Sequence, residues 1–246
     1  MTDQNLRLTR RDLLRLGVVA GPASLVAGCG WDGGPGLEPK LRAFSRINDW
    51  VGEKILFSSS RLAREYSVAA RTPTQHFPAY SITYNRTKSF PSPDNLNDWG
   101  LEVGGLVRNR MRFTLQALEA LPSLTYTVKH HCVEGWTAVA TWTGVPVSTI
   151  AGLVDPTAEA RYLRFDSFDS RYSNGWDFAS AMHPQTILAY AYNDRPLLMN
   201  RGAPVRLYSP IKLGYKLTKY LSAMTFTRDR PGGYWEDQGY PWFAGI

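Results

Sequence analysis

Short stretches of the chain alternate between apolar and polar residues, and this period of two predicts β-strands. The clearest is Thr125-Tyr126-Thr127-Val128, in which β-branched and aromatic residues predominate. Leu101-Glu102-Val103 and Leu106-Val107 predict two more strands around a turn or bulge at Gly104-Gly105. Further strands are predicted over residues 138–142, 162–165, 205–208 and 223–227.

Helical spacing of apolar residues occurs in four short segments. Leu115, Leu118 and Leu121 fall on one side of a helix that Pro122 ends. The spacing also predicts helices over residues 147–154, 58–68 and 183–192, the last with Ile187 and Ala191 facing inward. Strands and short helices follow one another without a regular βαβ rhythm. The pattern therefore predicts an α+β domain with a mixed sheet.

The N-terminal stretch differs from the rest and has the features of an export leader. Thr9-Arg10-Arg11-Asp12-Leu13-Leu14 precedes an apolar run too short to span a bilayer, which is typical of a twin-arginine signal. Val26-Ala27-Gly28-Cys29 resembles a lipobox, whose cysteine is acylated after cleavage; an ordinary small-residue cleavage site is the alternative. We predict a signal peptide over 1–28, a tether and N-terminal segment over 29–70, and a domain over 71–246.

Composition and charge exclude one class of function. The formal net charge is +7, and the leader accounts for only a small part of the excess. Because no segment carries a dense stripe of lysine and arginine, we predict no nucleic-acid binding. The excess of positive charge remains compatible with an anionic cofactor or substrate. The 8 Trp, 13 Tyr and 10 Phe either pack the core or wall a cofactor cleft.

Cys132 is the main candidate for chemistry. The chain has 2 cysteines, and if Cys29 is acylated, Cys132 has no disulfide partner. It follows a predicted strand, in the sequence His130-His131-Cys132-Val133-Glu134-Gly135-Trp136. An inert buried thiol is one interpretation, and a metal ligand or nucleophile is the other. Twin-arginine passengers are exported folded and often carry cofactors, which favours ligation.

Three stretches together resemble the sulfite-oxidase fold family of molybdenum enzymes. The first is His131-Cys132-Val133-Glu134-Gly135-Trp136, which is most similar to the bacterial periplasmic methionine sulfoxide reductase catalytic subunits. The second runs from Gly202-Ala203-Pro204-Val205-Arg206-Leu207 through Pro210 to Lys219. The third, weaker, is Thr72-Pro73 with Phe77 behind it. The resemblance covers roughly residues 70 to 230. It implies a single molybdopterin-binding domain with mixed sheets and a molybdenum-molybdopterin cofactor.

The resemblance also implies roles for individual residues. Cys132 would be the molybdenum ligand and the catalytic residue. Arg201 stands where relatives usually have asparagine or histidine, and Tyr80 replaces an arginine of the sulfite oxidases. Those enzymes also have a C-terminal dimerisation domain, for which this chain, ending at Ile246, has no room. We therefore expect a monomer and a substrate other than sulfite. The expected cofactor-binding residues are Phe77, Tyr80, His131, Cys132, Ser167, Arg201, Arg206, Gly214, Lys216, Thr218 and Lys219.

The chemistry of these residues fits such a cofactor independently. A metal held by a dithiolene accepts one more soft thiolate, which an unpaired cysteine supplies. Arg206, Lys216 and Lys219 lie within one short segment and suit a phosphate. A solvated face is the alternative for such lysines, and we expect it for Lys212. Gly214 either lets the backbone approach a ligand or serves a turn.

The remaining polar candidates have two interpretations each. His130 and His131 precede the cysteine in strand register and should point to opposite faces, so that one of them contacts the cofactor. Glu134 is a candidate proton donor, with a capping or salt-bridge role as the alternative. The aromatic C-terminal stretch 232–243 forms either a lid or partner patch, or a tail packed on the domain.

The expected function is a molybdopterin-dependent oxidoreductase of the bacterial cell envelope, performing two-electron oxygen-atom transfer such as S-oxide or N-oxide reduction. The chain has no CxxCH, no cysteine set for an iron–sulfur cluster and no GxGxxG, so electrons require a separate partner. The resemblance implies a membrane cytochrome b. Periplasmic location and a lipid anchor at Cys29 follow from the leader. The rivals are a zinc or copper site built from Cys132 and a neighbouring histidine, and a non-catalytic binding lipoprotein.

Overall fold

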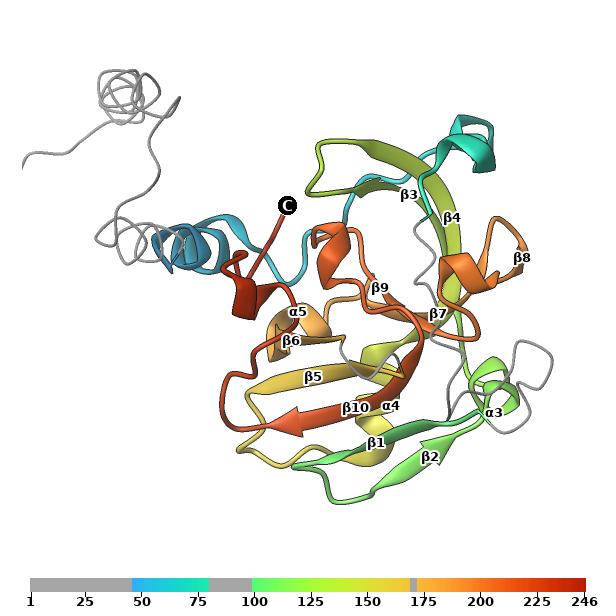
Figure 1. Cartoon of the computed structure of the whole chain (residues 1–246). Helices are drawn as coiled ribbons and strands as arrows, with labels where there is room; N and C mark the ends of the chain where they lie inside the picture. The colour runs from blue at the N-terminus through green and yellow to red at the C-terminus, as the bar shows by residue number, and fades with distance from the viewer. Residues whose placement is uncertain (1–45, 80–98, 169–171) are drawn as a thin grey trace, which may run out of the picture. The chain divides into compact units, whose positions relative to one another are not determined.

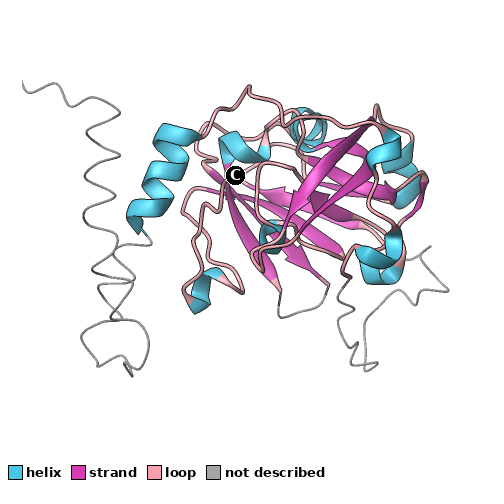
Figure 2. Ribbon diagram, turned by 90° about the horizontal axis from the view of Figure 1, so that it is seen from above, coloured by secondary structure: helices cyan, strands magenta, loops and turns pink. Residues whose placement is uncertain are grey.

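Two β-sheets and a few short helices make up the described part of the protein (Figures 1 and 2). The computed structural model describes residues 46–79, 99–168 and 172–246, which belong to one compact unit, Ser45–Ile246. Tyr80, predicted at the cofactor, lies outside the described residues, as does the leader. Within the described ranges, no helix is both long enough and apolar enough to cross a membrane.

The first sheet is mixed, as predicted. Its strand order is β2-β1-β10-β5-β6, and β1 runs parallel to β10 while the other neighbours are antiparallel. Gly105 ends β1 in the left-handed region, at φ 85°, and a Cβ there would lie 2.2 Å from the Phe226 carbonyl oxygen of β10. Only glycine fits this approach. The strands are β1 (Leu101–Gly105), β2 (Met111–Phe113), β5 (Tyr162–Ser167), β6 (Ser173–Asp177) and β10 (Leu221–Thr227).

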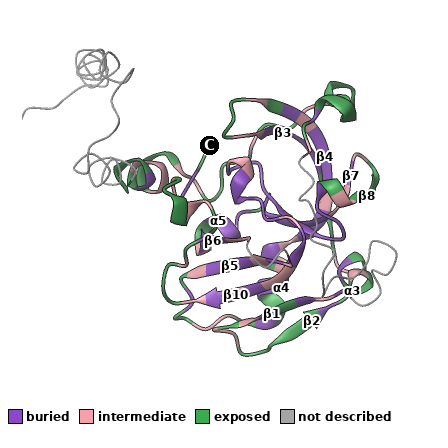
Figure 3. Ribbon diagram, in the orientation of Figure 1, coloured by how far each residue is buried: buried purple, intermediate pink, exposed green. Residues whose placement is uncertain are grey.

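The second sheet is antiparallel and carries the Cys132 hairpin. Its order is β3-β4-β7-β8, and β9 pairs with β7. The two sheets share one apolar core in which Trp142 of β4 stacks on Tyr208 of β9 at 3.9 Å between ring centroids (Figure 3). The strands are β3 (Leu124–His131), β4 (Thr137–Pro146), β7 (Ile187–Tyr192), β8 (Arg195–Pro196) and β9 (Arg206–Tyr208).

Two predicted helices are confirmed. Thr114 caps α3 (Leu115–Glu119) by accepting a hydrogen bond from the Ala117 amide. Helix α4 (Val147–Val154) follows β4 directly and buries its apolar face. The remaining helical turns are short: η1 (Gly52–Leu56), η2 (Val68–Ala70), η3 (Thr74–His76), α5 (Phe178–Ala181), η5 (Met199–Arg201), η6 (Gly214–Lys216) and η7 (Glu236–Gln238).

Two other predicted helices are wrong. Residues 187–192 form β7, which β4, β8 and β9 flank. A central strand is apolar on both faces, so its spacing does not distinguish it from a buried helix. Residues 58–68 form a loop, because Glu65 bridges Val128 and the Tyr66 amide bonds the Thr127 carbonyl. Pairing with β3 there outweighs local helix propensity.

The C-terminal stretch is a tail packed on the domain. Trp242 and Phe243 are buried, and the Asp49 carboxylate accepts hydrogen bonds from both of their amides, at 2.9 and 2.8 Å. The Tyr215 hydroxyl donates to the Pro241 carbonyl. The first and last described segments of the chain therefore meet on one side of the domain.

Candidate active site

The β3–β4 hairpin presents Cys132 at its tip. The last pair of the hairpin is His131 with Thr137, and the turn is closed by hydrogen bonds from the Cys132 amide to Trp136 O and from the Gly135 amide to Cys132 O. Gly135 has φ 87°, a conformation that favours glycine. Cys132 therefore stands at the strand end, as predicted, on a rigid support.

The thiol has one polar neighbour of note. Cys132 Sγ lies 3.8 Å from Glu134 Oε2, and Trp136 Nε1 donates to the same oxygen at 2.9 Å. Burial raises the pKa of the half-buried thiol. Among the described residues, no three histidine, cysteine or carboxylate side chains converge to hold a metal ion. The zinc or copper alternative therefore finds no ligand set in the part of the chain that is described.

The two histidines before Cys132 have different surroundings, as their alternation predicts. His130 is buried among the rings of Phe77, Trp136 and Tyr208, with centroids 5.3, 5.4 and 6.0 Å away. Burial, followed by the charge of Arg206, lowers its pKa to about 3, so the ring is neutral. Its Nδ1 is buried without a hydrogen-bond partner. His131, the predicted cofactor contact, is more exposed, and burial lowers its pKa less far.

Behind these rings lies a cluster of cations, Arg201, Arg206 and Lys219, which we call the open cluster. Arg206 donates to the carbonyls of Arg201 and Leu217, both at 3.0 Å. Lys219 donates to the Asn200 carbonyl at 3.0 Å. Both arginines are buried, and neither takes part in any ion pair recorded among the described residues.

The two buried arginines of the open cluster repel each other. Burial lowers the pKa of Arg206 to about 10. Burial, together with repulsion from Arg206 and Arg201, lowers the pKa of Lys219 to about 7. Buried charges ordinarily have an opposite charge beside them. A bound phosphate would supply it, and arginine matches phosphate geometry with two parallel donors. The donor set therefore fits the phosphate of a pterin cofactor.

Aromatic rings connect the open cluster to the Cys132 hairpin. The Arg201 guanidinium lies 4.5 Å from the centroid of the Phe77 ring, which is 5.7 Å from Trp136. Arg201 also donates to the carbonyls of Thr74, Phe77 and Pro78. The thiol, the rings and the cations therefore lie in one region, so the structure brings together Phe77, Cys132, Arg201, Arg206 and Lys219; their cofactor contacts stay a prediction.

Three smaller predicted residues lie next to this region. Thr218 is buried and its Oγ1 accepts from Asn174 Nδ2 at 3.0 Å. Ser167 ends β5 and is buried. A Cβ at Gly214 would lie 2.9 Å from His130 Nε2. Gly214 thus allows the backbone to approach the His130 ring.

The structure does not bring the Lys216 ammonium into the open cluster. Lys216 is fully buried, where it pairs with the Glu236 carboxylate and donates to the Gly175 carbonyl at 2.7 Å. Glu236 neutralises the charge of Lys216, so the structure does not place this ammonium where the sequence predicted it, at the cofactor phosphate. The solvated face expected for Lys212 is wrong as well, because Lys212 is buried and donates to the Phe243 carbonyl at 2.7 Å.

Sequence reasoning named His131 and not His130, whereas the structure packs His130 among the rings of this region, a burial that the alternation of β3 indicates. Tyr126 and Val128 are the apolar, buried positions of β3, and a period of two places His130 on the same face. A hollow of about 760 Å³ occurs elsewhere among the described residues. It lies beside α4 and α5, lined by Glu53, Asp155 and Asp177 among others, and includes no predicted site residue.

Comparison with known proteins adds independent findings. Residues 88–235 match the family model "Oxidoreductase molybdopterin binding domain". The chain is 39% identical over 240 residues to "Putative protein-methionine-sulfoxide reductase subunit YedZ1" of Azospira oryzae, covering 96% of this chain and 87% of that protein. It is 25% identical to "Protein-methionine-sulfoxide reductase catalytic subunit MsrP" of Campylobacter jejuni, covering 100% of this chain and 83% of that protein.

A solved structure supports the fold. The sulfane dehydrogenase SoxCD of Paracoccus pantotrophus superposes with a TM-score of 0.52 at 20% identity, over 55% of this chain and 40% of that chain. At this identity the likeness concerns the fold alone. It agrees with the α+β, sulfite-oxidase-type arrangement of mixed sheets that the sequence predicts.

Proposed function

The chain belongs to the family of oxidoreductases with a molybdopterin-binding domain, and on that premise we propose that it reduces sulfoxides, with Cys132 as the protein ligand of molybdenum. The supporting observation is the free thiol of Cys132 on a rigid hairpin, joined by a wall of rings to buried arginines whose hydrogen bonds, within the described ranges, go to backbone carbonyls. The relatives named as methionine sulfoxide reductases direct the proposal to protein-bound methionine sulfoxide.

Each group in the site has a distinct task. The bound cofactor supplies two-electron oxygen-atom transfer. Cys132 holds the metal as a thiolate, a soft ligand on a rigid turn. Arg206 and Lys219 hold the phosphate and orient the pterin. The Phe77 and Trp136 rings exclude water from the region between Cys132 and the phosphate-binding cations. Reduction of a sulfoxide consumes two electrons and two protons and releases water.

We propose that the electrons come from a membrane partner. The sequence contains no motif for haem, an iron–sulfur cluster or a dinucleotide, so a second protein must deliver them, and the family resemblance indicates a cytochrome b. Export by the twin-arginine leader and acylation at Cys29 would place the enzyme beside such a partner in the cell envelope.

The test combines metal and pterin analysis with Cys132→Ser. Protein folded in a molybdenum-replete host should contain molybdenum and pterin. The serine variant should keep its fold and lose more than about 100-fold in sulfoxide reduction, beyond what loss of an outer-shell contact costs. Val133→Ser, an exposed neighbour in the same turn, is the control. Zinc or copper in place of molybdenum, no metal at all, or full activity in Cys132→Ser would refute the proposal.

Location has its own test. Arg10→Lys with Arg11→Lys should leave cofactor-loaded protein in the cytoplasm, because the translocase receptor recognises arginines and not charge alone. Cys29→Ala should permit export but remove the acyl anchor, which acts through buried CH₂ groups. Cell fractionation distinguishes the two variants, because the first should stay in the cytoplasm and the second should be exported without its anchor. Export of the double-lysine protein with its metal would contradict the twin-arginine route.

A further inference from the structure

The helical segment 46–56 has its apolar face turned outward. Ile47, Trp50, Val51, Lys54 and Ile55 follow the spacing of one helix face. Ile47 is 55% exposed, Trp50 56% and Ile55 61%. In a globular domain such a stripe ordinarily faces the core. In Figure 3 the segment is largely green, the colour of exposed residues.

Polar contacts on the opposite side fix this orientation. Asp49 is the buried residue of the segment; besides the amides of Trp242 and Phe243, its carboxylate contacts Arg230 at 3.2 Å. Gly52 lies against the Phe243 ring, where a Cβ would be only 3.1 Å from the ring. Turning the apolar stripe inward would move Asp49 out to solvent and leave the amides of the buried Trp242 and Phe243 without their acceptor. The stripe is therefore held outward.

The composition of the stripe suits a membrane surface. Tryptophan is enriched at the lipid–water boundary, and lysine and arginine beside apolar residues are attracted to anionic headgroups. Lys54 lies within the stripe, where it pairs with Glu53 at 2.5 Å, and Arg46 lies at its edge; both cations are exposed. Lys40 and Arg42 precede the segment in sequence. A large exposed apolar stripe of this kind marks an interaction surface.

The position of the stripe along the chain also favours lipid. Residues 30–45 separate Cys29 from the segment. Sixteen residues can span no more than about 55 Å even when fully extended. An acyl chain at Cys29 would therefore hold the stripe close to the bilayer, and one acyl group with a second membrane contact anchors far more firmly than either alone.

We propose that the face formed by Ile47, Trp50, Val51, Lys54 and Ile55 binds the surface of an anionic lipid bilayer. The apolar side chains enter the headgroup boundary while Arg46 and Lys54 contact the lipid phosphates. Because Asp49 ties the segment to the domain, this contact also fixes how the domain is oriented on the membrane. The inference rests on the proposed location in the cell envelope but not on the proposed reaction.

Vesicle binding tests the inference. The cofactor-loaded full chain with Cys29→Ala, which excludes any acyl contribution, is mixed with vesicles of phosphatidylglycerol and phosphatidylethanolamine and sedimented. The protein should bind, and Trp50→Ser with Ile55→Ser should weaken binding at least about tenfold, because two large apolar side chains no longer leave water. Vesicles of phosphatidylcholine alone should bind more weakly.

Matched controls separate the face from general hydrophobicity. Leu62→Ser and Val68→Ser replace side chains that are 56% and 58% exposed outside the segment, and both should bind as the parent does. Pterin content and sulfoxide reduction with a soluble electron donor should be unchanged in every variant, which keeps this test apart from that of the reaction. Equal binding by the Trp50/Ile55 variant would overturn the inference.

Other occupants of the face would give different results. A second copy would appear as concentration-dependent dimerisation in light scattering, abolished by Trp50→Ser, without binding to protein-free vesicles. A membrane protein would retain the chain on native membranes but not on protein-free vesicles. Either result would overturn the assignment to lipid.

Discussion

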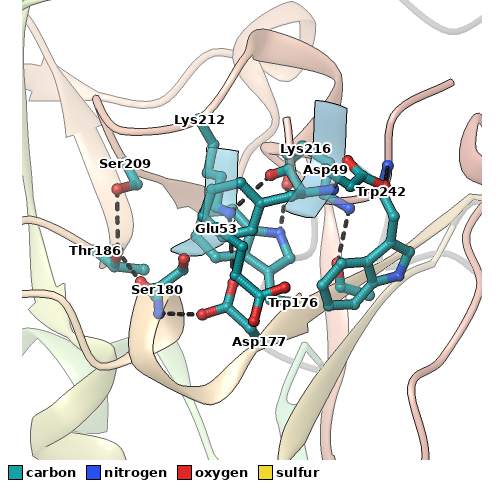
Figure 4. Close-up of polar contacts among 12 residues, drawn as sticks. Asp49, Glu53, Trp176, Asp177, Ser180, Thr186, Ser209, Lys212, Lys216 and Trp242 are labelled. Atoms are coloured by element: carbon teal, nitrogen blue, oxygen red, sulfur yellow. Dashed lines mark hydrogen bonds and ion pairs between the residues drawn. The ribbon is translucent and has the colours of Figure 1, made fainter. Parts of the chain in front are cut away.

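Two groups of cations differ in the partners of their buried members. In the group formed by Lys212 and Lys216, which we call the closed cluster, the chain supplies carboxylates (Figure 4). Lys216 pairs with Glu236, and Lys212 lies 3.4 Å from Asp177. In the open cluster, the arginines donate only to backbone carbonyls among the described residues. The difference indicates which cluster is built for an external anion.

Strand β6 fixes the position of η6, between Lys212 and Lys219. Asn174 donates to the Tyr215 carbonyl and to Thr218 Oγ1, and Trp176 donates to the Lys216 carbonyl. These contacts from β6 hold η6 in place. Lys219, at the far end, therefore projects from a segment that is anchored independently of any ligand. A preformed site of this kind binds its ligand without first ordering a loop.

Breaking the closed cluster should have the largest effect on stability. Lys216→Met leaves the Glu236 carboxylate buried without its cation, which typically costs about 3–5 kcal/mol. The midpoint of urea unfolding should fall accordingly. Because methionine fills a similar volume, adding Glu236→Gln should recover part of the loss. If Lys216→Met alone were as stable as the parent, the Lys216–Glu236 ion pair would not contribute to the stability of the fold.

Breaking the open cluster should affect the cofactor more than the fold. Arg206→Met removes a charge-assisted contact to phosphate, typically about 1.5–3 kcal/mol, or roughly 10- to 100-fold in affinity. The cofactor-free form should lose far less stability than Lys216→Met does, because the buried guanidinium has no carboxylate to leave behind. Arg206→Lys keeps the charge but not the two parallel N–H donors of the guanidinium, so its cofactor affinity should be intermediate. Released pterin per protein measures retention; equal pterin in all three proteins would contradict the assignment.

The contrast between the clusters also explains what the sequence could predict. The hairpin, the placement of Cys132 and the segment rich in cations are local features, visible as period-two alternation and as charge within a few residues. The family resemblance then identified the cofactor. It rests on residues 131–136, which form the strand end and turn of the hairpin, taken together with residues 202–219.

The errors arose where distant residues decide the outcome. Lys216 and Arg206 look alike in sequence, but Glu236 reaches Lys216 from the C-terminal tail. Asp49 reaches that same tail across 193 residues. Residues 187–192 became a strand because β4 and β9 pair with them, which their own spacing does not reveal. Ion pairs and strand pairing between residues far apart in the sequence can be recognised only in the folded structure.

The smallest expected effect is a pH dependence that distinguishes the two clusters. Burial lowers the pKa of Lys212 and of Lys219 to about 7 in the folded chain, from an ordinary value of 10.5. Above pH 7 the unfolded chain therefore binds protons that the folded chain has released, and the free energy of unfolding should rise from pH 7 to about 8.5. A phosphate beside Lys219 would restore its proton, so cofactor-loaded protein should show a shallower rise. Lys212→Met should also flatten the rise, in both forms alike. Urea unfolding at several pH values measures this; identical slopes for loaded and cofactor-free protein would show that the ligand's charge does not reach Lys219.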